Sequence, residues 1–183
     1  MTYPLRTDRL EISPLDAQDA EAFVRYRQDE DVARWQGWEP NYGASDAADL
    51  IASQPSTDLP THGGWLQLAI RDPSTRTLLG DAAIHRLEEP ADTYEIGVTL
   101  APASQGRGIA SEAITRILGY LFTAGNAHRV TANCDARNDA VARLLVGVGM
   151  RNESRQIDVE FFKGEWITLD GYAILKSEHS ARA

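Results

Sequence analysis

The sequence predicts a single α/β domain built on a mixed, mostly antiparallel sheet of seven strands flanked by helices. One observation is a change of periodicity, since helical spacing prevails in residues 16–54 and strand patterns follow in residues 65–100. Another is the long amphipathic segment 110–122, which separates two strand-like runs as a crossover between parallel strands requires. The length of 183 residues suits one domain that spans residues 1–183.

The first third of the chain predicts one strand and three helices. Residues 9–15 alternate apolar and polar side chains, which is typical of an edge strand. The expected helices, with Asp16 and Ser45 as N-caps of the first and the third, cover residues 16–28, 29–35 and 46–54. The turn-rich segment 55–64 predicts an exposed loop.

Three strands in hairpins are expected next, because short polar separators divide three strand-like runs. These runs cover residues 65–72, 78–88 and 93–100. The helix over 110–122 then leads to a strand over 129–134. A second helix over 139–149 has Asn138 placed to cap it and Gly149 to end it.

A closing hairpin is expected around Lys163 and Gly164, formed by strands over 154–162 and 165–175. The tail from residue 176 is expected to be frayed.

Composition excludes several classes of protein. A net charge of −9 argues against a nucleic-acid surface, which needs clustered Lys and Arg, and it suits a cationic substrate. No run of about 18 apolar residues exists that could span a membrane. The single cysteine, Cys134, and the absence of an apolar leader predict a cytoplasmic protein without an internal disulfide. The four scattered histidines lack metal-ligand spacing, so no metal site is expected.

The stretch APASQGRGIASEAI, residues 101–114, predicts an anion site at the start of a helix. The first turn of a helix leaves N–H groups unpaired, and glycines allow a phosphate to approach the backbone closely. A Walker A loop is excluded because Gly-Ile-Ala replaces Gly-Lys-Ser/Thr. A dinucleotide fingerprint is disfavoured because Ser111 stands where a third glycine is needed. A diphosphate on a long acyl carrier and a plain helix-start turn remain open.

A family resemblance favours the acyl carrier. Residues 105–110, Gln-Gly-Arg-Gly-Ile-Ala, resemble the Q/R-x-x-G-x-G/A signature of the GNAT acetyltransferases. The segment TDRLEISPLDAQDAEAF resembles the opening of the RimJ/RimL branch, and YEIGVTLAPASQGRGIASEAI, HRVTANCDARNDAVARLLVGVGM and GEWITLDGYAIL follow that branch in order. The resemblance covers nearly the whole chain. It implies a GNAT fold, acetyl-CoA as the donor and a primary amine as the acceptor.

The resemblance also implies the donor site. The backbone N–H groups of the glycine turn would hold the diphosphate of acetyl-CoA, with the Arg107 charge at the rim. The strand end before the turn would pair with the pantetheine amides, and one of its N–H groups could face the thioester oxygen. Asn138 would contact the pantetheine arm as well as cap its helix. The expected cofactor-binding residues are Val98, Thr99, Leu100, Gln105, Gly106, Arg107, Gly108, Ile109, Ala110 and Asn138.

Glu95 is the first candidate for the base that takes a proton from the acceptor amine, with an outward-facing strand glutamate as the alternative. His85 is the second candidate, because its ordinary pKa lies near neutrality, although a strand histidine is often structural. Trp35, Trp38 and Tyr42 would wall the acceptor pocket, or else pack in the core.

The resemblance breaks at the residue that would protonate the leaving thiolate. Leu145 stands where many GNAT enzymes have a tyrosine, and Val141 where RimJ/RimL relatives commonly have a serine. Asn133 stands where some N-terminal acetyltransferases carry a glutamate. No acid is therefore assigned.

Two functions are consistent with this pattern. The first is an N-acetyltransferase that acts on a protein N-terminus or on a small-molecule amine, possible also as a homodimer through its long C-terminal hairpin. The second is an acyl-CoA-binding sensor or partner-binding module without catalysis, which the missing acid keeps open.

Overall fold

An eight-stranded mixed sheet forms the centre of the computed structural model, which describes residues 3–181. In spatial order its strands are β1 (Leu5–Arg6), β2 (Glu11–Pro14), β3 (Trp65–Arg71), β4 (Leu78–Arg86), β5 (Thr93–Leu100), β6 (Arg129–Asp135), β8 (Glu165–Leu175) and β7 (Arg151–Phe162). All neighbours are antiparallel except β5 and β6, which are parallel. The expected mixed sheet with one parallel crossover is confirmed.

The expected number of seven strands is wrong by one, because the N-terminal segment forms a small hairpin. A turn breaks it after Arg6, where the Leu10 N–H donates to Thr7 Oγ1 and the Thr7 N–H to the Leu10 carbonyl. Leu5 and Leu10, on either side of this turn, are both buried. β2 is the strand that was expected over residues 9–15, and β1 is an additional strand before it.

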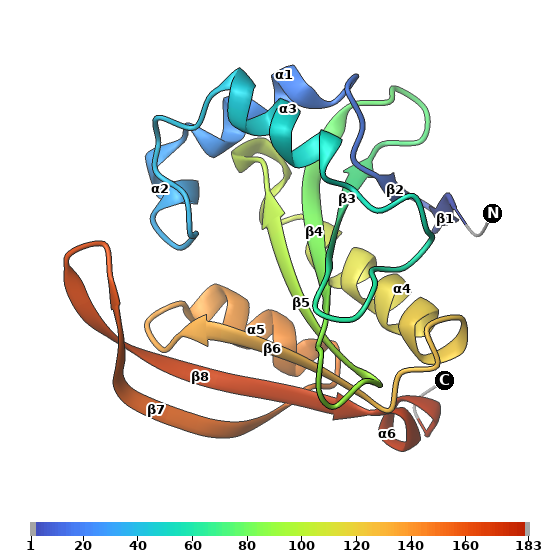
Figure 1. The fold of residues 1–183 in the computed structure, drawn as a ribbon, viewed down its shortest axis with the longest axis vertical. Coiled ribbons are helices and arrows are strands. Elements are labelled where there is room, and N and C mark those ends of the chain that lie inside the picture. The colour runs from blue at the N-terminus through green and yellow to red at the C-terminus, as the bar shows by residue number, and fades with distance from the viewer. Residues whose placement is uncertain (1–2, 182–183) are drawn as a thin grey trace.

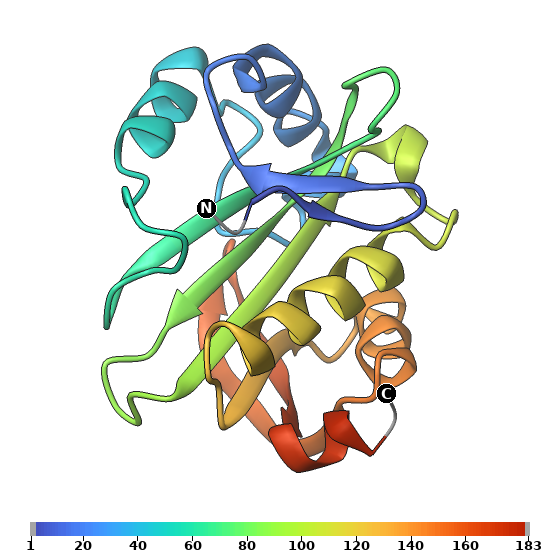
Figure 2. The same ribbon diagram turned by 90° about the vertical axis from the view of Figure 1, so that its right-hand side faces the viewer.

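Helices cover both faces of the sheet (Figures 1 and 2). On one face lie α1 (Ala20–Arg27), α2 (Glu30–Ala33) and α3 (Ala44–Ala52). On the other face lie α4 (Ile109–Thr123) and α5 (Asp139–Gly147), and a 3₁₀ turn, η1 (Pro102–Ser104), precedes α4. All five expected helices are present, with ends shifted by at most four residues.

The structure corrects three expected helix or chain ends. Asp16 does not cap α1, because Asp19 lies at the N-cap position and the Asp16 carboxylate accepts from the Gln18 N–H instead. Ser45 lies inside α3, whose start is fixed by the Gly43 N–H donating to the Asp46 carboxylate at 2.7 Å. The tail forms a short helix, α6 (Lys176–Ser180), because Glu178 accepts from the Leu175 N–H.

Two apolar cores sandwich the sheet. The larger one lies beneath α4 and α5 and includes Ile114, Ile117 and Leu121 from α4. The smaller one lies beneath α1 and α3 and includes Phe23 and Ala47. The apolar stripe of α4 was predicted from its spacing, and burial of such side chains is the main stabilising contribution to the fold.

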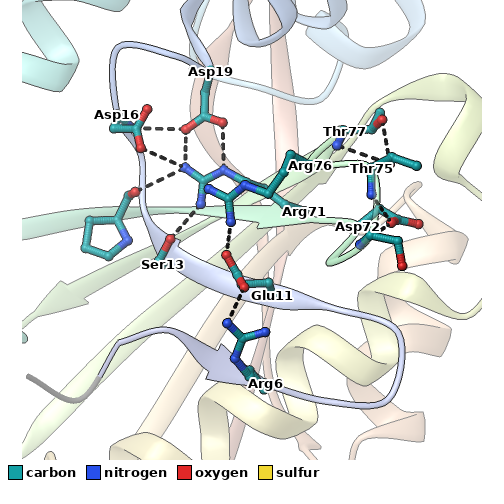
Figure 3. A network of polar contacts seen from close by, with 12 residues as sticks. Arg6, Glu11, Ser13, Asp16, Asp19, Arg71, Asp72, Thr75, Arg76 and Thr77 are labelled. Carbon is teal, nitrogen blue, oxygen red and sulfur yellow. Dashed lines mark hydrogen bonds and ion pairs between the residues drawn. The ribbon is translucent and has the colours of Figure 1, made fainter.

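A buried arginine joins α1 to the sheet at its N-terminal edge (Figure 3). The guanidinium of Arg71 on β3 donates Nε–H to Asp19 Oδ1 at 2.8 Å and pairs through Nη2 with Asp19 Oδ2. It also donates to Ser13 Oγ on β2 at 2.6 Å. Only 2% of the Arg71 side chain is exposed, so its charge depends on these partners.

Replacement of Asp19 by Asn should destabilise the fold by about 3 kcal/mol, because it leaves the buried guanidinium with only the half-exposed carboxylate of Asp16, 3.5 Å away, as a counter-charge. Urea denaturation of both proteins measures the difference in the free energy of unfolding. The matched control is Glu21→Gln, two residues along, which removes an exposed ion pair with Arg25 and should cost less than about 0.5 kcal/mol. Equal losses in the two variants would contradict a special role for the buried pair.

Candidate functional site

The parallel strands β5 and β6 pair over three residues and then diverge, as Figure 1 shows. The paired positions are Thr93, Tyr94 and Glu95 with Arg129, Val130 and Thr131. Beyond Glu95, the edge of β5 that faces β6 has no strand partner among residues 3–181. A strand edge of this kind offers free N–H and C=O groups to an extended ligand.

A cavity of about 670 Å³ lies along this free edge. Most of the predicted donor-site residues line it, namely Val98, Thr99, Leu100, Gln105, Gly106, Gly108, Ile109, Ala110 and Asn138. The predicted residue Arg107 is not part of this lining. A smaller cavity of about 120 Å³ extends between the diverging strands and shares Trp35, Val98 and Asn138 with the larger one.

The glycine turn presents a row of unpaired donors at the end of the large cavity. Gly106 and Gly108 have left-handed φ values of 70° and 75°, which few other residues adopt without strain. Within the described chain, the N–H groups from Gly106 to Ser111 have no hydrogen-bond acceptor. Successive free N–H groups in such a turn, followed by the 15-residue helix α4, form a site that fits a diphosphate.

Nothing lies within 4 Å of the position that a Cβ atom would occupy on Gly106. The space in front of the turn is therefore open to a ligand. The turn lies between β5 and α4, as predicted, and its use as an anion site stays a prediction.

Asn138 does what its position predicted and more. Its Oδ1 accepts from the Val141 N–H at 3.2 Å, so it caps α5. It also lines both cavities, which leaves the amide near the path of a ligand. The N-cap and ligand-contact interpretations are therefore compatible.

Glu95 and His85 lie side by side on the sheet face opposite α4. They are paired in register on β5 and β4, with His85 Nδ1 3.9 Å from Glu95 Oε2. That nitrogen has no hydrogen-bond partner within the described part of the chain. A nitrogen or water that bridges the two groups would satisfy it.

Two residues outside the predicted site hold this pair: Trp65, which the sequence analysis did not name, and Asn133, which it named only as the replacement of a family glutamate. The side chain of Asn133 on β6 donates to Glu95 Oε1 at 3.1 Å, across the point where the strands part. The indole of Trp65 stacks on the His85 ring with a centroid distance of 4.3 Å and an interplanar angle of 3°. Asn133 also lines the smaller cavity, so Glu95 is connected to the site through it. The alternation of side chains along paired strands could have indicated Trp65, because Trp65 lies directly opposite His85 in the β3–β4 hairpin and on the same face of the sheet.

The three aromatic residues predicted for the acceptor pocket lie in two different places. Trp35 lines both cavities. Trp38 and Tyr42 pack against the smaller core, where Trp38 covers the guanidinium of Arg27 at 3.7 Å. The Arg27 charge, buried beside Asp81, accounts for this cluster through cation–π contact.

Lys163 at the tip of the β7–β8 hairpin joins this hairpin to α2 and the segment that follows it. Its Nζ donates to the carbonyls of Ala33 at 2.9 Å and Trp38 at 2.6 Å. The first of these ends α2, so the ammonium also complements the helix dipole. No local pattern indicates this contact, because it joins segments about 130 residues apart.

Residues that could protonate a leaving group are few. Leu145 is buried and apolar, and Val141 lies at the cavity wall. Cys134 lines the smaller cavity, and burial with the nearby Asp170 and Asp135 carboxylates raises the pKa of its thiol to about 11.

Within residues 3–181 no three His, Cys, Asp or Glu side chains are grouped as a metal site needs. No helix in this part of the chain is long and apolar enough to cross a membrane.

Comparisons with known proteins agree with this geometry. The family described as Acetyltransferase (GNAT) domain matches residues 9–151. The N-acetyltransferase p20 of Bacillus licheniformis is 28% identical over 96% of this chain and 98% of its own.

Two solved structures superpose over nearly the whole chain. An acetyltransferase of the GNAT family from Bacillus anthracis has a TM-score of 0.83 and 26% identity, covering 95% of this chain and 99% of its own. The spermidine N-acetyltransferase of Vibrio cholerae, solved in complex with CoA and spermine, has a TM-score of 0.82 over the same shares. At 19% identity the second shows the fold alone. Fold, cavity and family match together show that this chain is an acyltransferase that belongs to the GNAT acetyltransferase family.

Proposed function

We propose that this enzyme transfers the acetyl group of acetyl-CoA to a cationic primary amine while both substrates are bound. The observation that carries the proposal is that the large cavity follows the unpaired edge of β5 from the glycine turn and shares lining residues with the smaller cavity, where Asn133 donates a hydrogen bond to Glu95. One end of these two cavities suits a diphosphate and the other a proton transfer.

The donor would lie along the large cavity. The N–H groups from Gly106 to Ala110 would hold the diphosphate, and the edge of β5 from Val98 to Leu100 would pair with the pantetheine amides. Asn138 would contact the same arm from α5. Support comes from the lining of the cavity and from the relative solved with CoA.

Glu95 would accept the proton of the acceptor ammonium, which has no lone pair until it loses one. Asn133 donates a hydrogen bond to Glu95 Oε1. The other oxygen, Oε2, lies beside His85 Nδ1 and would accept the proton of the substrate. The freed nitrogen then forms a bond to the acetyl carbon, the carbon–sulfur bond breaks, and the nitrogen releases its second proton to solvent to give the neutral amide.

The thiolate leaves with its electron pair and takes a proton from solvent, because thiols are acidic enough to leave unassisted. Holding amine and thioester in line contributes much of the rate.

The acceptor class follows from charge. The net charge of −9 favours a cationic amine, and Asp31 contributes a carboxylate to a cavity lining that also contains Arg34 and Arg143. Two classes fit: a polyamine, as in the relative solved with spermine, and a protein N-terminus, as in the RimJ/RimL branch. Rates with spermidine and with a short peptide that has a free N-terminus decide between them.

Replacement of Glu95 by Gln should lower kcat by about 100-fold or more, because the amide cannot take a proton. The dissociation constant of acetyl-CoA should stay unchanged, since the donor site does not include Glu95. Steady-state kinetics and calorimetry measure the two quantities. Glu88→Gln, at an exposed position after β4, is the control and should behave as wild type. An unchanged kcat at every pH tested would remove Glu95 as the base.

Acetyl-CoA at about 100 times its dissociation constant should stabilise the protein by about 2.7 kcal/mol. For a chain of this size the midpoint of thermal unfolding should rise by about 5–10 °C. Gly106→Val should abolish this rise by filling the open space in front of the turn. Gly164→Val is the matched control, because Gly164 has a φ of 89° and equally open surroundings but lies in the β7–β8 turn. Each variant is compared with its own ligand-free midpoint. Equal rises of the unfolding midpoint in both variants would show that the donor does not bind at the glycine turn.

We also propose that the enzyme works in the cytoplasm as a homodimer. The β7–β8 hairpin exposes Ile157, Phe161 and Trp166 by 76%, 61% and 61%, and such apolar surface favours association. Light scattering should give the mass of two chains, and Phe161→Asp should reduce it to one. A wild-type mass of one chain would contradict the dimer.

A further inference from the structure

The loop between β1 and β2 reaches the glycine turn through one side chain, Arg9. Its Nη1 donates to the carbonyl of Arg107 at 3.1 Å, inside the turn. Its Nε and Nη2 contact Glu112 Oε2, in the first turn of α4, at 2.6 and 2.5 Å. Its guanidinium also lies 3.6 Å from the position that a Cβ atom would occupy on Gly108. One side chain therefore holds the turn and the start of the helix together.

The contact with the Arg107 carbonyl controls where the next N–H points. The peptide bond between Arg107 and Gly108 is planar and trans, so its C=O and N–H groups point in opposite directions. Arg9 holds the carbonyl toward the β1–β2 loop, and the Gly108 N–H is consequently directed away from that loop. Gly108 belongs to the lining of the large cavity. Without Arg9, this peptide unit loses the contact that fixes its orientation.

Arg9 also neutralises a carboxylate that would repel an anionic ligand. Glu112 lies within a few residues of the free N–H groups, and its side chain is 20% exposed. Although partial burial opposes it, hydrogen bonds from Thr7 and Arg9 lower the pKa of Glu112, so the carboxylate is charged. A charged carboxylate near the turn would weaken a diphosphate site unless a cation pairs with it.

We infer that Arg9 is a positioning residue for the donor diphosphate: it orients the Arg107–Gly108 peptide and pairs with Glu112 so that the turn can receive the anion. The inference rests on the proposed use of acetyl-CoA. It concerns the part of the donor beyond the pantetheine arm, and not the reacting thioester. A donor without the diphosphate should therefore not depend on Arg9.

The experiment compares acetyl-CoA with S-acetylpantetheine, which has the same thioester but no diphosphate, in wild type and in Arg9→Ala. The variant should raise the KM for acetyl-CoA and the calorimetric dissociation constant of CoA about tenfold, the size expected for a lost hydrogen bond to a charged group. Its kcat, and its kcat/KM with S-acetylpantetheine, should stay at the wild-type values. Arg9→Lys should lie between, because one ammonium cannot reach both the carbonyl and Glu112 as the fork of Arg9 does.

Arg116→Ala is the matched control. The Nε of Arg116 donates to the Arg6 carbonyl at 3.2 Å, so it joins the same N-terminal segment to α4 one turn farther from the glycines. This variant should bind CoA as wild type does, and thermal unfolding checks that both variants fold.

Other outcomes separate the possible failures. Equal CoA affinity in wild type and Arg9→Ala would overturn the inference, and so would an equal loss with both donors, which indicates a merely structural contact. Loss of CoA binding in Arg116→Ala to the same extent would overturn it as well. Wild-type protein that binds no CoA would instead overturn the proposed function itself, and the inference with it.

Discussion

The short parallel pairing of β5 with β6 is the constraint on which the rest of the structure depends. Two strands that stayed paired would close the sheet, and no ligand could reach the backbone of β5 beyond Glu95. Because they part, one strand edge is left free, and α4 and α5 supply the walls on either side. The crossover that a parallel pair requires is α4 itself, so its N-terminus necessarily begins at the far end of β5. The anion site and the strand edge are thus consequences of one topological choice.

Buried charges fix the outer elements against this divided sheet. Arg71 ties α1 to β2 and β3 through Asp19 and Ser13. Deeper in, Asp81 on β4 meets Tyr26 and Gln67, and burial raises the pKa of its carboxyl although Arg27 opposes the rise. Such networks contribute less to stability than to a unique arrangement, because only one placement of α1 satisfies them. Lys163 does the same for the β7–β8 hairpin, which it holds against α2.

The elements with strong local patterns were predictable from the sequence. The strands over 93–100 and 165–175 were placed at their observed ends, and the Asn138 cap and the glycine turn could be interpreted from residue type alone. The side-chain contacts that shape the site could not. The bond between Asn133 and Glu95 spans 38 residues and that between Arg9 and Arg107 spans 98, so no periodicity encodes them. The N-terminal hairpin was missed because a threonine hydroxyl, and not a glycine or proline, makes its turn.

The attachment of the glycine turn to the core limits how readily the turn opens and how much entropy it loses when a ligand binds. Ile109 and Ala113, in the first turns of α4, are 4% and 0% exposed, so the turn continues directly into the larger core. A loop attached in this way cannot open without disturbing the packing of the larger core. Its backbone is ordered when the chain folds, and little further ordering is required when an anion arrives. The glycine turn is therefore expected to bind its anion without a change of backbone conformation. Any conformational change that accommodates different acceptors is expected in the β7–β8 hairpin and α2.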